Sequence, residues 1–350
     1  MFGHFHRKYY FCNMKERINW VDWAKAWCMT VVVFDHTPHD GSHFLLQYLA
    51  GTNLASFFFV SGFLRGNSKA AVKPISKYVY SLLIPYLIYN AIYYPYWLAD
   101  FVVKHHGNIS VTDCIKPIAG TFLFQLNTSF SAELNGVTWF LLALFLMHWI
   151  TGLIQSLRHR YSIIILLSLA AMTLYGMNKY YHYAPNLTFN GFVRSLCFFF
   201  LGYVIGQKKL LKSPNPNKDL PIGILALTFS LAIFYWHINE TGFPQHIILY
   251  YTASFLAIPG CICLCRVLNQ QRLKLVTCIS TGTMIIFGLH RMLMGCIDYG
   301  LEKILSLENI VYSIPEAILL TVAIVLILIP AIIVARKHAP ILLGKRNSDT

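Results

Sequence analysis

Apolar residues occur in ten long runs along the chain, and polar residues are largely confined to the connections between them. A helix of about 20 apolar residues matches the hydrocarbon thickness of a bilayer. The pattern predicts an all-α polytopic membrane protein with about ten transmembrane helices in a single domain over residues 1–350. The runs are residues 20–34, 44–64, 78–98, 139–153, 162–177, 191–206, 222–236, 247–264, 276–296 and 311–334.

Composition agrees with this class, and the charge pattern adds an orientation. The mean hydropathy is +0.54 and only 12% of residues are charged, against roughly 25% in soluble domains. With the N-terminus inside, 21 of the 28 lysines and arginines fall in cytoplasmic parts and four fall outside. The positive-inside rule then predicts that both termini are cytoplasmic. The net charge of +14 reflects orientation and indicates no nucleic-acid partner.

This orientation assigns a side to each long connection. Residues 1–17, 207–220 and 336–350 become a cytoplasmic N-terminal segment, loop and tail. Residues 99–138 become a long extracytoplasmic loop. Its apolar stretch 118–126 is too short to span a bilayer, and it is predicted to be a re-entrant or interfacial segment.

The first apolar run carries two ionisable residues on one helical face. Lys25 and His36 are eleven residues apart, which returns to nearly the same face about 16 Å along a helix. Ionisable groups inside membrane helices usually mark functional paths, and Asp22 can pair with Lys25. Histidine can take and give a proton near neutral pH. Lys25, Asp35 and His36 are therefore candidate catalytic residues, although an interfacial polar role also fits His36.

Counting helical rise places several further ionisable residues at the depth of His36. They predict a polar cavity in the outer half of the membrane, because such groups are costly in lipid. His148, near mid-membrane, could line the floor of this cavity or simply pack in the core. The residues predicted to share the cavity with His36, as substrate or oxyanion groups, are Arg194, His290 and Arg291.

A basic cluster follows the second run at the inner boundary. Positive side chains bind phosphates through charge-assisted hydrogen bonds, although positive-inside bias also explains them. The candidate cofactor-binding residues are Arg65, Lys69, Lys73 and Lys77. No metal site is indicated, because the histidines of segment 36–43 lie in a Pro- and Gly-containing loop and the cysteines show no paired C-x-x-C spacing.

Several short segments, in order along the chain, resemble signatures of one family of membrane enzymes. Lys25, ten residues and then His36 are similar to its basic residue and histidine, and segment 56–64 is similar to its Phe-rich Ser-Gly-Phe-Leu signature. Segments 82–86, 139–141, 199–203 with Arg194, and 286–290 are weaker landmarks. The chain thus resembles the membrane-bound acyltransferase 3 family, and within it the fucose 4-O-acetylase-like branch.

The resemblance implies a bacterial inner-membrane O-acetyltransferase. It would move an acetyl group from cytoplasmic acetyl-CoA to a hydroxyl of a surface glycan or its lipid-linked sugar precursor, with membrane lipid around it and no metal. His36 would match the essential histidine and Lys25 its basic partner. One difference is that the family's Arg-x-x-Arg pair is replaced by Val79, Tyr80, Ser81 and Leu82, which leaves Lys73 and Lys77 as the nearest basic residues.

Two other functions fit parts of the sequence. A transporter or flippase for a glycan or small solute could use Lys25, His36, Arg194 and His290 as a polar path, although no internal repeat typical of many transporters is visible. A receptor or scaffold could bind a partner through the outer loop 99–138.

Overall fold

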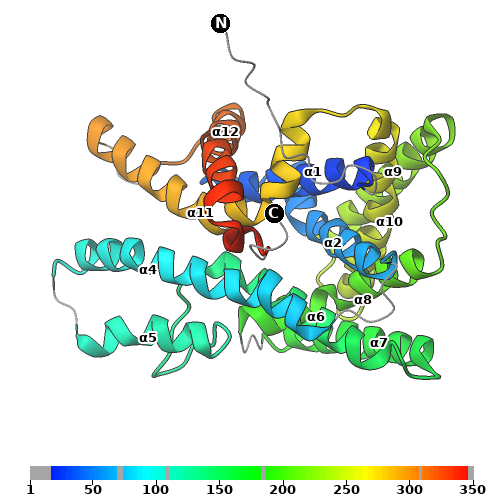
Figure 1. Ribbon diagram of the computed structural model, residues 1–350, viewed down its shortest axis with the longest axis horizontal. Coiled ribbons are helices and arrows are strands. Elements are labelled where there is room, and N and C mark those ends of the chain that lie inside the picture. Colours follow the sequence, from blue (N-terminus) through cyan, green and yellow to red (C-terminus); the bar gives the residue numbers. More distant parts are fainter. Residues whose placement is uncertain (1–16, 69–73, 108–109, 183–185, 307–309, 346–350) are drawn as a thin grey trace, which may run out of the picture.

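The computed structural model describes residues 17–68, 74–107, 110–182, 186–306 and 310–345, and these ranges are almost entirely helical (Figure 1). Within them the β contacts are two isolated bridges, His39 with Tyr312 and Leu126 with Asn186. The long helices are α1 (Asn19–Asp35), α2 (Phe44–Gly66), α4 (Ile84–Lys104), α5 (Val111–Phe122), α6 (Trp139–Ile154), α7 (Arg160–Tyr180), α8 (Leu187–Gln207), α9 (Pro216–Asn239), α10 (Gln245–Val267), α11 (Lys274–Leu305) and α12 (Ile314–His338). The short ones are α3 (Ile75–Tyr78), η2 (Val79–Leu83), η3 (Gly136–Thr138), η4 (Leu268–Gln270) and η5 (Pro340–Leu343).

Every predicted apolar run coincides with helical structure. Eight helices in the described ranges are long and apolar enough to cross a bilayer, which confirms the all-α polytopic membrane class. The two runs outside these eight are α1, which has 17 residues, and the run that begins in α3 and η2 and continues as α4. Ten crossings and the cytoplasmic location of both termini stay predictions.

Glycines allow α2 and α8 to pack unusually close together. Gly62 and Gly66 on α2 are four residues apart, as are Gly202 and Gly206 on α8. A Cβ atom on Gly62 would lie 1.9 Å from the Phe199 carbonyl oxygen, and one on Gly202 would lie 2.0 Å from the Phe59 carbonyl oxygen. Small residues at four-residue spacing let membrane helices approach backbone to backbone. The α2–α8 pair is therefore a rigid scaffold through the bundle.

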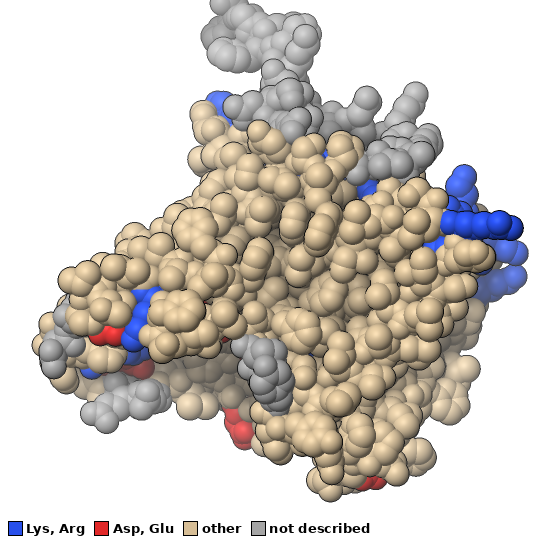
Figure 2. Space-filling view, turned by 90° about the horizontal axis from the view of Figure 1, so that it is seen from below, with Lys and Arg blue, Asp and Glu red and all other residues tan. Residues whose placement is uncertain are grey.

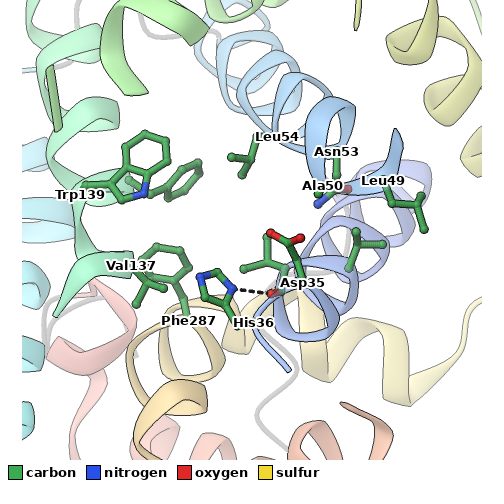
Figure 3. A pocket seen from close by; sticks show the side chains of 12 residues that line it. Asp35, His36, Leu49, Ala50, Asn53, Leu54, Val137, Trp139 and Phe287 are labelled. Atoms are coloured by element: carbon green, nitrogen blue, oxygen red, sulfur yellow. Dashed lines mark hydrogen bonds between the residues drawn. The ribbon is translucent and has the colours of Figure 1, made fainter. Parts of the chain in front are cut away.

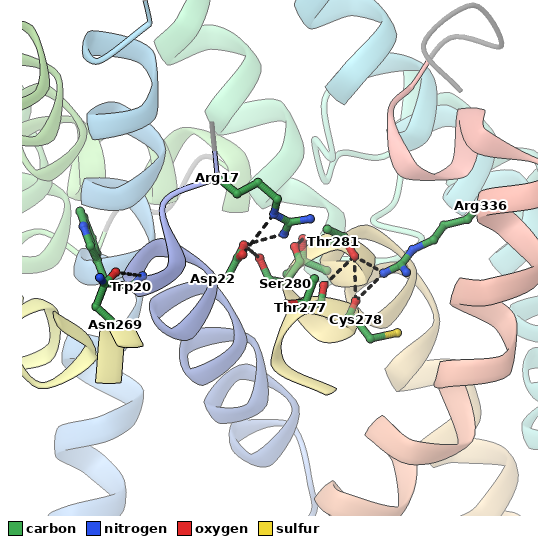
Figure 4. Close-up of polar contacts among 10 residues, drawn as sticks. Arg17, Trp20, Asp22, Asn269, Thr277, Cys278, Ser280, Thr281 and Arg336 are labelled. Carbon is green, nitrogen blue, oxygen red and sulfur yellow. Dashed lines mark hydrogen bonds and ion pairs between the residues drawn. The ribbon is translucent and has the colours of Figure 1, made fainter. Parts of the chain in front are cut away.

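Polar contacts fasten the beginning of α1 to neighbouring helices (Figure 4). Asp22, expected to pair with Lys25, forms an ion pair with Arg17 at 2.7 Å and accepts a 2.6 Å hydrogen bond from the Ser280 hydroxyl of α11. The Trp20 main-chain N–H donates to the Asn269 side chain at 3.0 Å. These bonds set the depth and rotation of α1, the helix that carries Lys25 and His36.

The long connection 99–138, predicted to be extracytoplasmic, contains helix α5, which packs beside α4. In Figure 1, α4 and α5 lie side by side as an arm that projects from the rest of the bundle. The Tyr86 hydroxyl of α4 donates to the Thr121 carbonyl oxygen of α5 at 2.6 Å. The first part of the apolar stretch 118–126 belongs to α5, whose 12 residues are too few to cross a bilayer. The stretch therefore does not form a further crossing.

Charged side chains are unevenly distributed over the surface. On the face shown in Figure 2, lysine and arginine gather at the end opposite the α4–α5 arm. Within the arm, Lys104 pairs with Asp100 at 2.8 Å and Lys116 pairs with Asp113 at 3.3 Å. The arm is therefore nearly neutral, in keeping with the charge asymmetry along the sequence.

Candidate functional site

A large cavity, here called the basic cavity, lies among α1, α2, η2, α6 and α11. Its volume is about 470 Å³, within the size range of small-molecule sites. Lys25, Arg65 and Lys77 contribute positive charge, and no Asp or Glu occurs among its described lining residues. Three cations with no facing acid create a positive potential that attracts anions. Lys69 and Lys73, predicted to belong to the same cluster, lie outside the described residues.

Arg65 is held rigidly in the wall of the basic cavity. Its guanidinium donates to the Tyr78 hydroxyl at 2.5 Å and to the Gln155 side-chain oxygen at 3.0 Å. Arg65 is buried, and within the described chain its Nε has no hydrogen-bond partner. A buried guanidinium held only by neutral groups keeps its charge available to an anionic ligand.

An aromatic stack forms another part of the wall of the basic cavity. The His148 ring stacks on the Tyr78 ring with centroids 4.2 Å apart and an interplanar angle of 14°. His148 was predicted either to line the floor of the outer cavity or to pack in the core. It packs against Tyr78 and Phe199 and lines the basic cavity, because the rotation of α6 turns it toward Tyr78.

A second, smaller cavity, here called the histidine pocket, surrounds the end of α1. Its volume is about 50 Å³, and Figure 3 shows Asp35 and His36 facing it together with Asn53 of α2 and Trp139 of α6. The α1 face predicted from the Lys25–His36 spacing lines both cavities in turn. Lys25 and Met29 face the basic cavity, and Val32 and His36 face the histidine pocket.

The backbone of α1 fixes the tautomer of His36. Its Nδ1 lies 2.7 Å from the Val32 carbonyl oxygen, and a carbonyl can only accept a hydrogen bond. Nδ1 therefore carries the proton in the neutral ring, which leaves a lone pair on Nε2. This is the state required of a general base or a nucleophile.

His290 of α11 forms an imidazole pair with His36. The two ring centroids are 5.1 Å apart in an edge-to-face arrangement. His290 Nδ1 donates to the Ile286 and Phe287 carbonyl oxygens at 2.9 and 3.0 Å. Its Nε2 is buried without a hydrogen-bond partner among the described residues, and such an orphan polar atom is costly. The Nε2 of His290 is thus available to accept a hydrogen bond from a ligand or a neighbouring donor.

Polar side chains fix the segment before α6, which contributes to the wall of the histidine pocket. Thr138, which precedes Trp139, accepts hydrogen bonds from Gln125 at 2.8 Å and from Asn90 at 3.1 Å. Gln125 and Asn90 are almost completely buried. A satisfied buried network of this kind holds one conformation, and it positions Val137 and Trp139 in the pocket wall.

The remaining predicted residues are only partly brought together. Arg291 is exposed and lies near Glu133, because both side chains approach Gly136. A Cβ atom added to Gly136 would lie 3.3 Å from Nη1 of Arg291 and 2.1 Å from Oε1 of Glu133. Burial raises the pKa of Glu133, and the positive charge of Arg291 opposes that rise. Arg194 is outside the lining of both cavities. It interacts instead with Tyr175, Tyr250 and Tyr251, so the predicted common cavity does not include it.

Several residues of the site carried no recognisable signal in the sequence. Tyr78, Asn53 and Gln155 are ordinary polar residues at helix ends or within apolar runs. Phe140 and Phe287 lie within the landmark segments 139–141 and 286–290, but nothing in those segments indicated that the two rings meet. Their roles follow from contacts between helices distant in sequence, which no local spacing encodes.

Within the described residues, no group of three His, Cys, Asp or Glu side chains is arranged to hold a metal ion.

Comparison with known protein families gives a match. A family model described as an acyltransferase domain matches residues 18–336, which is nearly the whole chain. No curated protein and no solved structure matches.

Proposed function

The chain belongs to the acyltransferase 3 family, and from this premise we propose that it is a membrane-bound O-acetyltransferase. It takes an acetyl group from cytoplasmic acetyl-CoA and transfers it to a hydroxyl of a surface glycan or a lipid-linked sugar precursor. The observation that carries the proposal is that one face of α1 lines a cationic cavity and, further along, a pocket with a basic imidazole nitrogen.

The basic cavity suits the donor by charge. Acetyl-CoA carries several phosphate charges and a long flexible arm that ends in the thioester. Lys25, Arg65 and Lys77 supply the opposite charge. Ser81 and Leu82, within the segment 79–82 that replaces the family's Arg-x-x-Arg pair, also line this cavity. The cations of α1, α2 and α3 therefore replace that pair as contacts for the donor.

The histidine pocket suits the chemical step. The acceptor hydroxyl gives its proton to Nε2 of His36 as its oxygen attacks the thioester carbonyl carbon. The carbon–sulfur bond then breaks, and the departing thiolate takes the proton from the imidazolium, so that the products are the acetyl ester and free CoA. General base catalysis of this type contributes about 10²–10⁴-fold.

His290 is proposed to support the charged form of His36. When His36 gains a proton, its Nε2 becomes a hydrogen-bond donor, and the orphan Nε2 of His290 is the acceptor placed beside it. This arrangement stabilises charge that develops only during reaction, in a site with little water. Arg291, exposed next to this pair, is placed to contact the acceptor.

The test is transfer of labelled acetyl from acetyl-CoA to an extract of lipid-linked sugars and surface glycans by the purified protein in nanodiscs. We expect transfer by the natural chain, a loss of about 10²–10⁴-fold in His36→Ala, and no loss in the control His43→Ala, whose exposed side chain lies outside both cavity linings. Near-normal transfer by His36→Ala would refute the assignment. Movement of a glycan lipid across vesicles without consumption of acetyl-CoA would favour the transporter function.

Cell location and topology are part of the same proposal. We place the enzyme in the bacterial inner membrane with both termini in the cytoplasm, so that the basic cavity opens toward the CoA pool. Mass spectrometry of surface glycans from cells with and without the gene tests the acceptor through the presence or absence of an acetyl group.

A further inference from the structure

A pair of phenylalanine rings separates the basic cavity from the histidine pocket. Phe140 of α6 and Phe287 of α11 line both cavities. Their side chains are only 5% and 7% exposed, and their ring centroids are 5.3 Å apart. The rings therefore form a shared wall between the two cavities.

Neighbouring rings hold this wall in place. Phe57 and Phe58 of α2 contact Phe140 with centroid distances of 5.0 and 4.8 Å, and Phe58 is completely buried. On the other side, the rings of Phe287 and His290 lie 6.4 Å apart. Since buried side chains are packed about as densely as organic crystals, passage between the cavities requires the Phe140 and Phe287 rings to move.

We propose that Phe140 and Phe287 are the size-selective partition through which the acyl end of the donor reaches His36. The proposal rests on the proposed function and names the acyl class. Only a short acyl group, such as acetyl, fits past the two rings into a pocket of about 50 Å³. The closed rings also keep water of the basic cavity away from the imidazole pair, which limits hydrolysis of the thioester.

Chain-length preference tests the partition directly. We expect Phe287→Ala and Phe140→Ala to raise the ratio of butyryl to acetyl transfer about 10-fold or more, since apolar pockets discriminate by roughly 10–200-fold per methylene. The matched control is Phe198→Ala, a buried phenylalanine that packs against Tyr251 and Phe255 away from both cavities. An unchanged ratio in both partition variants, or an equal rise in the control, would overturn the proposal.

A labelling experiment tests the same wall without acyl transfer. Ser61→Cys reports on the basic cavity and Ala50→Cys on the histidine pocket. A small charged methanethiosulfonate is applied to sealed vesicles from the side on which Ser61→Cys reacts, and the modified peptide is located by mass spectrometry because native cysteines are present. We expect Ala50→Cys to be protected, and to react once Phe140 and Phe287 are both alanine.

The two experiments separate failure of the partition from failure of the enzyme assignment. Two results would overturn the partition even if transfer is observed. One is rapid labelling of Ala50→Cys while Phe140 and Phe287 are present, and the other is continued protection of Ala50→Cys after both are changed to alanine. The expected labelling together with no transfer from acyl-CoA would refute the proposed function but would still support the partition between the two cavities. If the alanine variants do not fold, Phe287→Leu repeats both measurements with a smaller opening.

Discussion

The two cavities of this protein are lined by the same face of α1 and nevertheless differ in volume and charge. The basic cavity is about 470 Å³ and carries three cations. The histidine pocket is about 50 Å³, and its lining is mostly apolar around Asp35 and His36. The first has the properties of a binding site for a large anion, and the second those of a site for one proton transfer.

The difference arises from what each cavity receives from the helices opposite α1. Arg65 and Lys77 come from α2 and α3 near their predicted cytoplasmic ends, where positive residues are common. The histidine pocket receives Val137 and Trp139 from a locked outer loop, and Phe287 from α11. In the proposed function, donor binding and proton transfer therefore depend mainly on different neighbours of α1.

The largest expected effect comes from the histidine pocket. His36→Gln keeps a polar side chain and removes the basic nitrogen, so we expect kcat to fall by about 10²–10⁴-fold while affinity for the donor is retained. Steady-state kinetics and equilibrium binding of CoA give the two values. A comparable loss of CoA binding would show that donor binding and catalysis are not separated between the two cavities.

The next largest effect comes from the basic cavity. Lys25→Met keeps the length of the side chain and removes its charge, so we expect affinity for acetyl-CoA to fall about 10-fold or more, the value of one charged hydrogen bond. Binding titration measures the change. Arg158→Met, at an exposed position outside the cavity lining, is the control, and equal losses in both variants would indicate only a general surface-charge effect.

A third change breaks the scaffold that supports both cavities. Gly202→Val places a Cβ atom 2.0 Å from the Phe59 carbonyl oxygen, whereas a Cβ atom on Gly152 meets nothing within 4 Å. We expect Gly202→Val to lower the free energy of unfolding by about 1–3 kcal/mol and to impair both CoA binding and transfer, because α2 lines both cavities. Thermal unfolding in detergent compares it with Gly152→Val, and equal melting temperatures would contradict the close packing.

The smallest expected effect concerns pH and the outer loop. Burial raises the pKa of Glu133 above its ordinary value of 4.5, so the protonated carboxyl is favoured by folding. Its contribution to stability is present below pH 4.5 and is lost as the pH rises through the raised pKa. We expect Glu133→Gln to remove this pH dependence of the free energy of unfolding. The effect is under about 1 kcal/mol after allowance for solvent screening.

Melting temperatures between pH 4 and pH 7 measure the Glu133 effect. Glu240→Gln, at the far end of α9, is the control. An identical pH slope in the natural chain and in Glu133→Gln would show that this carboxyl titrates as it does in water.

The sequence landmarks divide into two physical classes once the structure is available. Lys25 and His36 line the cavities, as their position on one face predicts. Gly62 and Gly202, inside the landmarks 56–64 and 199–203, instead form the close α2–α8 contact. A signature can thus record a packing requirement as well as a chemical one, and one chain alone does not distinguish the two.

The sequence by itself determined the membrane class, the helical runs and the shared face of Lys25 and His36, because hydropathy and helical period are local properties of the chain. Only the tertiary structure decided which of the predicted residues meet. His290 pairs with His36, Arg194 lies outside both cavities, and Phe140 and Phe287 lie between the two cavities. These outcomes depend on the rotation and depth of helices that are distant in sequence, which side-chain packing fixes and local periodicity leaves open.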